Sequence, residues 1–282
     1  MIFLTGSSGF IGSNFAKFYI RKKIKFRGID KKKNVYLKSK YFIKLNLLNK
    51  QKLYKLFAKY KPKVVLHLAA DSGLNYCHLN QSASFKNNIE ATFNLLQSCV
   101  KYNCKNIIIA SSMAAENYYD NPSFYGFTKM TSENLFNTYK EKYGLKSTIL
   151  RFSNIFGIFS SHKSSAIHKM IQCLVDKKRF FEIHGTGKQK RDFLYSEDLV
   201  IKTQKILKKK NRKFLYDVNS KKKYSINQIL SLIQIISNNN IMSKNIKPPL
   251  GYDVTYDKKA SNKFNKNLKR NLVKTINWYK DN

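Results

Sequence analysis

A glycine-rich turn within the first dozen residues constrains the fold of this chain more than any other feature. The apolar run Ile2–Thr5 breaks at Gly6, and a segment with helical apolar spacing follows. Gly6 permits the turn, Gly9 lets a ligand approach the backbone, and Gly12 lets the helix pack closely on the strand. The free N–H groups at such a helix start attract a pyrophosphate. We therefore predict a dinucleotide site that includes Gly6, Ser8, Gly9, Phe10, Ile11 and Gly12.

An acidic residue at the end of the next apolar segment supports this prediction. Asp30 follows Gly12 by eighteen residues and closes the run that begins at Ile24. A carboxylate at this place accepts both ribose hydroxyls of the adenosine and repels a 2′-phosphate, which favours NAD over NADP. The three lysines that follow, Lys31–Lys33, would tolerate that phosphate, so NADP stays open as the alternative.

Strand and helix patterns alternate along the first 150 residues, which predicts a doubly wound α/β fold with a parallel Rossmann-type sheet. The continuous apolar run Lys63–Ala70 is typical of a buried parallel strand. We place an NAD-binding domain at 1–157, with later segments returning to the sheet, and a smaller α/β substrate lobe at 158–282. The predicted helices are 51–59, 82–102, 125–143, 164–178, 196–209, 225–236 and 268–278, and the later predicted strands are 106–110, 147–152, 181–184 and 214–219.

Composition limits the classes of partner. The formal net charge is +38, but the 54 basic residues comprise 47 lysines and only 7 arginines, spread along the whole chain. Dedicated nucleic-acid readers tend to use arginine in a localised patch, so we interpret the charge as compositional and expect no nucleic-acid partner. No apolar run approaches a membrane span. The four cysteines show no paired spacing, so we expect reduced thiols, a cytoplasmic location and no metal site.

A serine, a tyrosine and a lysine form the candidate catalytic group. Tyr125 and Lys129 are four residues apart and lie on one helix face. A lysine ammonium nearby favours the phenolate of a tyrosine, whose ordinary pKa of about 10 makes it a poor base at neutral pH. Ser112 ends the strand before this helix, at the sheet edge where open α/β sheets bind ligands. Its hydroxyl can hold a substrate oxygen beside the tyrosine.

With these residues in place, the chain resembles the extended short-chain dehydrogenase/reductase superfamily, in its NAD-dependent nucleotide-sugar epimerase/dehydratase branch, which includes UDP-glucose 4-epimerases. The resemblance runs nearly end to end. It rests on the glycine turn, on Ser112, Tyr125 and Lys129, and on the motifs His67–Ala70, Asn88–Thr92, Arg151–Gly157, Gly185–Leu199 and Thr275–Tyr279.

The resemblance assigns further residues to the two ligands. It implies that the cofactor site also contains Asn46, Leu47, Leu68, Ala69, Ala70, Asn88, Ala110, Tyr125, Lys129 and Phe152. It implies that a nucleotide-diphospho-sugar, with UDP favoured, contacts Ser112, Asn154, Arg191 and Asp253. A homodimer is also implied, through the helices predicted at 82–102 and 125–143. Leu95, Val100, Leu135 and Phe136 would permit it but could equally face the sheet.

The residues after Ser112 narrow the reaction. Dehydration needs a positioned acid and base, yet Met113, Ala114 and Ala115 carry no acid, and the first acidic residue is Glu116. We therefore expect a 4-epimerase that oxidises the sugar transiently at C4 through a 4-keto intermediate. Only twelve residues separate Ser112 from Tyr125, a short spacing closer to some NAD(P)H-dependent nucleotide-sugar 4-keto reductases, which form the alternative. The second alternative is a non-catalytic relative that binds RNA or another polyanion.

Overall fold

The chain divides into two compact units. The structure is a computed structural model that describes residues 1–176, 180–248 and 264–282. Unit 1 contains Met1–Phe152 and Thr203–Asp217, and unit 2 contains Ser153–Lys202 and Val218–Asn282. Residues 153–157, which the sequence placed with the first domain, therefore belong to unit 2, because the short strand β7 (Asn154–Phe156) pairs with β9 (Lys190–Tyr195) there.

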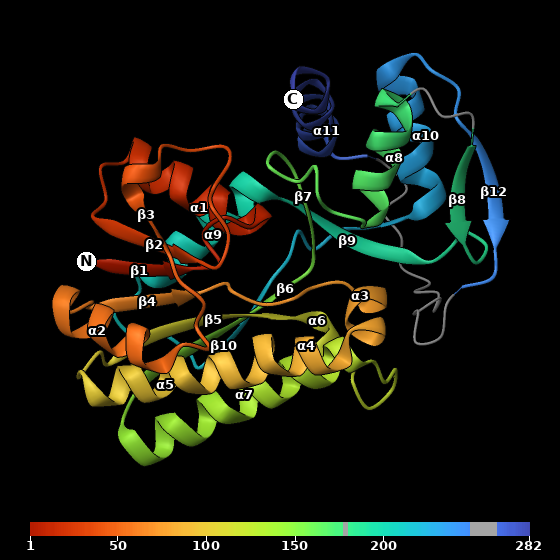
Figure 1. Cartoon of the computed structure of the whole chain (residues 1–282). Helices are drawn as coiled ribbons and strands as arrows, with labels where there is room; N and C mark the ends of the chain where they lie inside the picture. The colour runs from red at the N-terminus through yellow and green to blue at the C-terminus, as the bar shows by residue number, and fades with distance from the viewer. Residues whose placement is uncertain (177–179, 249–263) are drawn as a thin grey trace. The chain divides into compact units, whose positions relative to one another are not determined.

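Unit 1 is built on a seven-stranded sheet in the order β10-β6-β5-β4-β1-β2-β3 (Figure 1). Five neighbouring pairs, from β6 through to β3, are parallel, which confirms the predicted doubly wound α/β class. The strands are β1 (Ile2–Thr5), β2 (Phe26–Asp30), β3 (Phe42–Lys44), β4 (Val64–His67), β5 (Asn106–Ser112), β6 (Lys146–Phe152) and β10 (Leu215–Val218). Because the strands are parallel, their carboxyl ends meet at one edge of the sheet.

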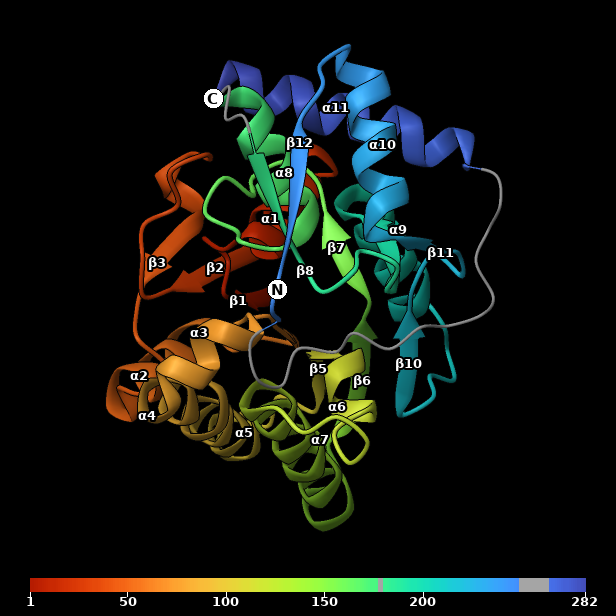
Figure 2. The ribbon, with the colours of Figure 1, turned by 90° about the vertical axis from the view of Figure 1, so that its right-hand side faces the viewer.

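Helices cover both faces of this sheet (Figures 1 and 2). On one face lie α2 (Lys50–Tyr60), α5 (Ala91–Lys101) and α7 (Phe124–Tyr143). On the other lie α1 (Phe10–Arg21) and the end of α9 (Ser196–Leu207), where Gln204 donates a hydrogen bond to the Tyr19 hydroxyl. Shorter elements are the 3₁₀ turn Ser39–Tyr41, α3 (Leu74–Leu79), α4 (Gln81–Phe85), the π turn Lys86–Glu90 and α6 (Met113–Glu116).

Two predicted elements differ from the structure. The helix predicted at 82–102 is divided into α4, the π turn and α5, because the chain widens by one residue per turn at Lys86–Glu90. The strand predicted at 214–219 was assigned to the smaller lobe, but as β10 it forms the edge of the main sheet, where Phe214 O accepts a hydrogen bond from Ile149 N.

Unit 2 has its own hydrophobic core beneath three helices. They are α8 (Ala166–Val175), α10 (Ile226–Ser237) and α11 (Lys266–Asp281), which pack against one another (Figure 2). Its strands are β7, β9 and β11 (Lys223–Ser225) in one sheet, and β8 (Phe180–His184) paired with β12 (Met242–Ile246) in another. Across the described residues of both units, no helix combines the length and apolar character that crossing a membrane requires.

Candidate active site

The glycine turn has the conformation and the close contacts that the sequence predicts. Gly6 has a φ of 68°, and a Cβ there would lie 2.5 Å from the backbone nitrogen of Ala69. A Cβ on Gly12 would lie 2.0 Å from the carbonyl oxygen of Gly6. Around Gly9, by contrast, a Cβ would meet only that same oxygen, at 3.3 Å. Gly6 and Gly12 are therefore required by packing, whereas Gly9 leaves space beside the backbone.

Helix α1 begins at this turn with the features of an anion site. Gly9 is its N-cap and has no side chain with which to cap it, and the first turn contains no acidic residue. The carboxylate of Asp30, at the end of β2, accepts a hydrogen bond from Ser8 N at 2.9 Å and another from Lys32 N at 2.9 Å. The charge of Asp30 thus lies directly against the turn, where the ribose of a bound dinucleotide is expected.

Asp30 provides a prediction about cofactor choice. In Asp30→Asn we expect the affinity for NAD to fall about tenfold, because a neutral amide accepts hydrogen bonds from ribose hydroxyls less strongly than a carboxylate. The preference for NAD over NADP should fall as well, because the 2′-phosphate is no longer repelled. Titration calorimetry of cofactor-free protein with each dinucleotide measures both effects. Unchanged discrimination would show that Asp30 does not contact the ribose.

Two buried hydroxyls hold His67 at the end of β4. Its Nδ1 lies 2.7 Å from Thr5 Oγ1 and its Nε2 lies 2.9 Å from Thr92 Oγ1. Thr92 in turn donates to the carbonyl oxygen of Asn88 at 2.5 Å. Burial lowers the pKa of His67 to about 3, and the charge of Lys129 acts in the same direction. The imidazole is therefore neutral at physiological pH and links β1, β4 and α5 beneath the site.

This histidine makes stability depend on pH. Because its folded pKa lies below the unfolded value of about 6.5, its contribution is fully present above that value and is lost as the pH falls toward 3. The expected slope is about 1.4 kcal/mol per pH unit below about pH 6. Urea unfolding of the wild type and of His67→Asn across this range should give a shallower slope for the variant. Parallel slopes would mean that His67 is protonated in the fold.

The π turn brings Asn88 to the loop that follows β4. Asn88 Oδ1 accepts from Asp71 N at 2.7 Å, and its Nδ2 donates to Asp71 O at 3.1 Å and to Thr128 Oγ1 at 3.0 Å. Asn88 thereby joins the segment after Ala70 to helix α7. Single-turn π segments inside α-helices are frequent at functional sites. Neither the hydrophobic periodicity nor the residue types predicted one here.

Ser112, Tyr125 and Lys129 meet at the carboxyl end of β5. The Tyr125 hydroxyl forms a hydrogen bond with the side chain of Ser112. Lys129 Nζ donates to the carbonyl oxygen of Ala110 at 3.0 Å and lies 5.9 Å from the centre of the Tyr125 ring. Gly126 permits this arrangement, because a Cβ there would lie 2.6 Å from Ala114 O, at the contact between α6 and α7. The predicted catalytic group is thus assembled within unit 1.

The acidity of Tyr125 differs from the sequence-based expectation. Lys129 was expected to favour the phenolate, but burial raises the pKa of Tyr125 to about 12, against the lowering effect of its hydrogen bond with Ser112. The buried thiol of Cys77, on α3, raises this pKa further. Desolvation is the largest effect on this pKa, and the Lys129 ammonium is directed to Ala110 O. Without ligands, this tyrosine is a phenol at neutral pH.

The other predicted cofactor residues also lie at the carboxyl edge of the unit 1 sheet. Asn46 and Leu47 follow β3, where Asn46 Oδ1 accepts from Leu48 N and Leu47 O accepts from Asn94 Nδ2. Leu68, Ala69 and Ala70 follow β4, and Ala110 and Phe152 lie near the ends of β5 and β6. The structure therefore gathers along one edge segments that are up to about 140 residues apart in sequence.

Two of the predicted substrate residues lie on neighbouring strands of unit 2. Asn154 is exposed on β7, and its Nδ2 donates to the backbone oxygen of Asp192 on β9. Arg191, also on β9, donates to the carbonyl oxygen of Lys190 at 2.8 Å. The carboxylate of Asp192 accepts hydrogen bonds from Ser220 and Lys222. The predicted substrate residue Asp253 lies outside the described residues.

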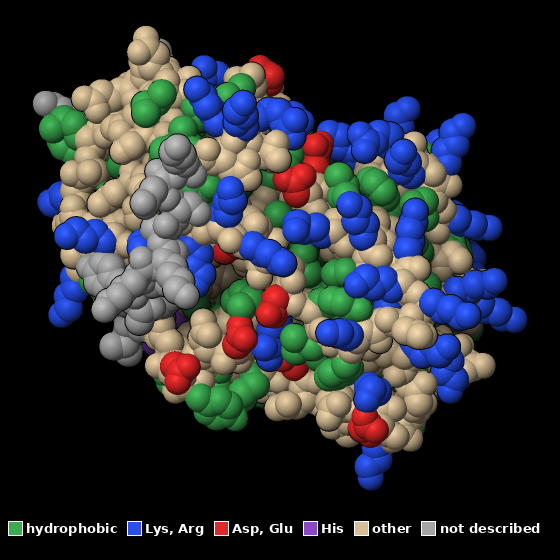
Figure 3. All heavy atoms as spheres, turned by 180° about the vertical axis from the view of Figure 1, so that it is seen from behind, with side chains coloured by type: hydrophobic (Ala, Val, Ile, Leu, Met, Phe, Trp, Pro, Cys, Tyr) green, Lys and Arg blue, Asp and Glu red, His purple; other side chains and the backbone are tan. Residues whose placement is uncertain are grey.

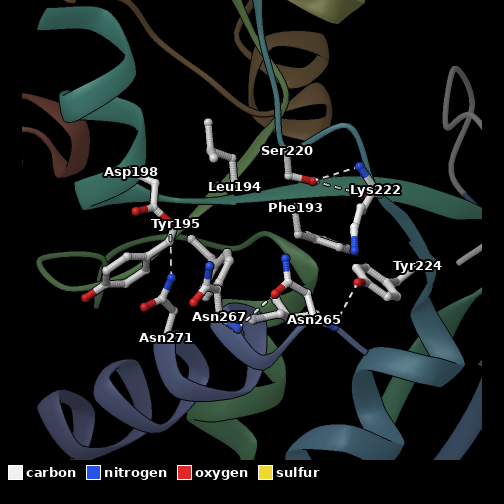
Figure 4. A pocket seen from close by; sticks show the side chains of 12 residues that line it. Phe193, Leu194, Tyr195, Asp198, Ser220, Lys222, Tyr224, Asn265, Asn267 and Asn271 are labelled. Carbon is white, nitrogen blue, oxygen red and sulfur yellow. Dashed lines mark hydrogen bonds between the residues drawn. The ribbon is translucent and has the colours of Figure 1, made fainter. Parts of the chain in front are cut away.

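A small cavity in unit 2 lies between β9 and the start of α11 (Figure 4). Its volume is about 50 Å³, and Asn271 donates to Asp198 at 3.2 Å in its wall. A buried water needs at least about 10–15 Å³ on this measure, so the cavity has room for only a few waters. It is too small for a nucleotide sugar, and neither Asn154 nor Arg191 lines it.

Several residues around the site were not singled out from the sequence. Asn34 donates from Nδ2 to Ser7 O and to Ser13 Oγ, both at 3.0 Å, which fastens the loop after Asp30 to the glycine turn. Glu133, which is buried, forms an ion pair with the partly buried Arg151 and accepts a hydrogen bond from Ser111. The role of Asn34 has a local signal, because it lies four residues after the acidic end of a strand. The pair of Glu133 and Arg151 joins residues eighteen apart, on a helix and a strand, and local sequence patterns do not show such pairs.

Comparison with known proteins agrees with this geometry. The model of the NAD dependent epimerase/dehydratase family matches residues 2–218. A UDP-glucuronate 4-epimerase of Thermodesulfobacterium geofontis is 26% identical, with 99% of this chain and 96% of that protein covered.

Solved structures of similar proteins extend over nearly the whole chain. A UDP-glucuronic acid 4-epimerase from Bacillus cereus, in complex with UDP-glucuronic acid and NAD, is 25% identical with a TM-score of 0.83, and 99% of each chain is covered. A UDP-glucose 4-epimerase from Thermotoga maritima, 22% identical, gives a TM-score of 0.86 over 99% of this chain and 98% of that one. The chain belongs to the NAD dependent epimerase/dehydratase family, and it is an enzyme with NAD as its cofactor.

Proposed function

We propose that this family member is a nucleotide-sugar 4-epimerase whose substrate is a UDP-linked sugar. The observation that carries the proposal is the group formed by Ser112, Tyr125 and Lys129 at the same sheet edge as the glycine turn. Its full-length relatives named above act on UDP-sugars. UDP-glucuronic acid, UDP-glucose and UDP-N-acetylglucosamine are therefore the substrates to test first.

The residues present fit the cofactor. The uncapped start of α1 at Gly9 offers backbone N–H groups to the pyrophosphate, and the Asp30 carboxylate is placed for the adenosine ribose. When bound, NAD supplies the reversible oxidation and reduction of the sugar carbon C4. The chain contributes placement and proton transfer.

Tyr125 would move the proton at the sugar O4. Its hydroxyl already forms a hydrogen bond with Ser112, so a sugar hydroxyl that enters beside both groups finds one acceptor and one donor. Ionisation of Tyr125 requires a lower pKa than the value of about 12 in the ligand-free protein. The positive charge of an oxidised nicotinamide ring nearby would lower it, as would Lys129 when its ammonium turns toward the phenolate. Proton transfer by a positioned group contributes about 10²–10⁴-fold.

The short helix α6 argues against dehydration. Met113, Ala114 and Ala115 contain no acid, and Glu116, the last residue of this single-turn helix, lies 3.8 Å from the guanidinium of Arg151. The nearest acid after Ser112 is thus paired with a cation rather than available to protonate a leaving hydroxyl.

Proton NMR of the purified protein with each UDP-sugar, without added cofactor, tests the proposal. New anomeric signals of the C4 epimer are expected, because an epimerase restores its cofactor in every cycle. Unchanged spectra with all three sugars, and again after NAD is added, would overturn it.

The short interval between Ser112 and Tyr125 favours one second candidate, a nucleotide-sugar 4-keto reductase. These twelve residues comprise α6, a turn and Phe124, the first residue of α7. A reductase consumes NAD(P)H in proportion to product, so loss of nicotinamide absorbance with a 4-keto sugar distinguishes it from an epimerase.

A polyanion-binding role has less support. Lysine and arginine side chains are spread over the face shown in Figure 3 rather than gathered in one stripe. A pure binding protein also has no need of the assembled group at Ser112. A steep fall of RNA affinity with salt, with no turnover of any nucleotide sugar, would favour this role instead.

The homodimer remains a proposal, with an interface that differs from the residues first considered. Leu95 and Phe136 are fully buried in the core against the sheet, and Val100 and Leu135 are partly buried against the same core. Phe93 on α5 is 38% exposed and Tyr143 on α7 is 49% exposed, and both rings contact Tyr139. We propose that these outward rings form the contact with a second copy. Light scattering of Phe93→Asp should then give a monomer where the wild type gives a dimer.

A further inference from the structure

The end of β5 is joined to α7 at three consecutive residues. Ala110 accepts from Lys129 Nζ through its carbonyl oxygen, Ser111 donates from its hydroxyl to Glu133 Oε1 at 2.5 Å, and Ser112 bonds with Tyr125. Tyr125, Lys129 and Glu133 are spaced by four residues and therefore share one face of α7. The contacts of Lys129 with Ala110 and of Tyr125 with Ser112 belong to the candidate catalytic group. The contact of Glu133 with Ser111 does not.

Glu133 is itself fixed by the neighbouring strand. Arg151 on β6 donates from Nε to Glu133 Oε1 at 3.0 Å and from Nη2 to Oε2 at 2.8 Å. In the sheet, Arg151 is the register partner of Ser111. Glu133 is 7% exposed and Arg151 is partly buried, so this two-bond pair is only weakly screened by water.

The arrangement restricts how α7 can slide or rotate against the sheet. Glu133 Oε1 receives both the Ser111 hydroxyl and Arg151 Nε, so a shift of the helix breaks bonds to two strands at once. A buried ion pair is weak support for stability, because desolvation offsets its Coulomb energy, but it constrains geometry strongly. Ser112 is covalently next to Ser111, and Tyr125 lies two helical turns from Glu133.

We propose that Glu133, held by Arg151, is a positioning residue that sets the distance between Ser112 and Tyr125 and so controls the catalytic step. The proposal deepens the proposed epimerase function and rests on it for its kinetic readout. Glu133 acts through Ser111 and α7 and does not itself contact the sugar.

Glu133→Gln tests this most directly, because it keeps the shape but removes the carboxylate that accepts two hydrogen bonds from Arg151, which keeps its longer contact with Glu116 at 3.8 Å. We expect kcat to fall about 100-fold while KM changes less than about threefold, since misplacement by about 1 Å costs on that order. Glu141→Gln is the matched control, because Glu141 lies on the same helix and its side chain is 63% exposed. It should leave both constants unchanged.

A paired variant separates positioning from folding. Replacement of a buried ion pair by apolar residues is often neutral for stability, so Glu133→Leu combined with Arg151→Met should keep the wild-type melting temperature and still lose kcat. Normal kcat in this folded double variant would overturn the proposal. If Glu133→Gln lowered the melting temperature but left kcat unchanged, the role of Glu133 would be structural, and the proposal would also be overturned.

A substrate-free measurement keeps the test independent of the proposed function. Crystal structures of the ligand-free wild type and of Glu133→Gln give the distance between Ser112 Oγ and Tyr125 Oη directly. In Glu133→Gln we expect this distance to increase, because a neutral amide holds Ser111 and Arg151 less strongly than the carboxylate does. If the wild type turns over no UDP-sugar, the epimerase proposal fails, and this comparison still decides the role of Glu133. An unchanged distance would contradict it.

Discussion

Tyr125→Phe should lower turnover of a UDP-sugar by about 10²–10⁴-fold, the range that a positioned acid–base group contributes. The phenyl ring fills the same volume, so the expected loss is that of the hydroxyl that contacts Ser112. Lys129 keeps its hydrogen bond to Ala110 O, and the cofactor should therefore remain bound. Initial rates by NMR and the nicotinamide content of the purified variant measure the two effects.

Tyr143→Phe serves as the matched control for this prediction. Tyr143 lies on the same helix and is half exposed, and the same substitution removes the same atom while it keeps the ring that the proposed dimer contact uses. Its rate should match the wild type. If Tyr125→Phe retained more than about a tenth of wild-type turnover, the proton at the sugar oxygen would have to move through another group, and the proposed function would lose its acid–base residue.

The dinucleotide half of the fold is predictable from the sequence because its determinants are local. The turn from Gly6 to Gly12 is defined by backbone space that only glycine leaves free, and the run before Ala70 is apolar on both faces. Parallel strands then bring their carboxyl ends to one edge. Ser112 and Tyr125 come together because of this topology and because Gly126 lets α7 approach α6 closely. No local sequence pattern specifies their contact directly.

The features that were missed depend on contacts between distant segments. The π turn at Lys86–Glu90 contains one apolar residue, Ile89, so hydrophobic spacing gives no signal of the altered helical register there. Strand β10 has four residues, too few for its sequence pattern to show which sheet it joins. Its pairing with the main sheet is decided by contacts with distant parts of the chain. The raised pKa of Tyr125 comes mainly from desolvation in the folded chain, and Cys77 on α3 acts in the same direction, neither of which spacing along the chain expresses. The link from Glu133 to Arg151 is likewise visible only in three dimensions.

Gly12→Ala should be among the most destabilising single substitutions in unit 1. A Cβ at this position would lie 2.0 Å from Gly6 O and 2.7 Å from Ser7 Cα, and both are backbone atoms that cannot move aside alone. Helix α1 would have to shift away from β1, which opens the contact of Phe15 with the core. Overpacking usually costs about 1–3 kcal/mol, and a clash with backbone belongs at or above the top of that range. Thermal unfolding should show a midpoint lower by about 6–12 °C.

Gly9→Ala distinguishes packing from ligand approach at the same turn. Its φ of −76° suits alanine, and its Cβ would meet only Gly6 O, at 3.3 Å, so the melting temperature should fall by no more than a few degrees. The added methyl group instead occupies the space beside the start of α1, so cofactor content should fall sharply. The two substitutions should thus affect different quantities. Gly12→Ala should lower the melting temperature, and Gly9→Ala should lower the amount of NAD that the purified protein retains. If Gly9→Ala kept its full nicotinamide content, the pyrophosphate would have to lie elsewhere than against this turn.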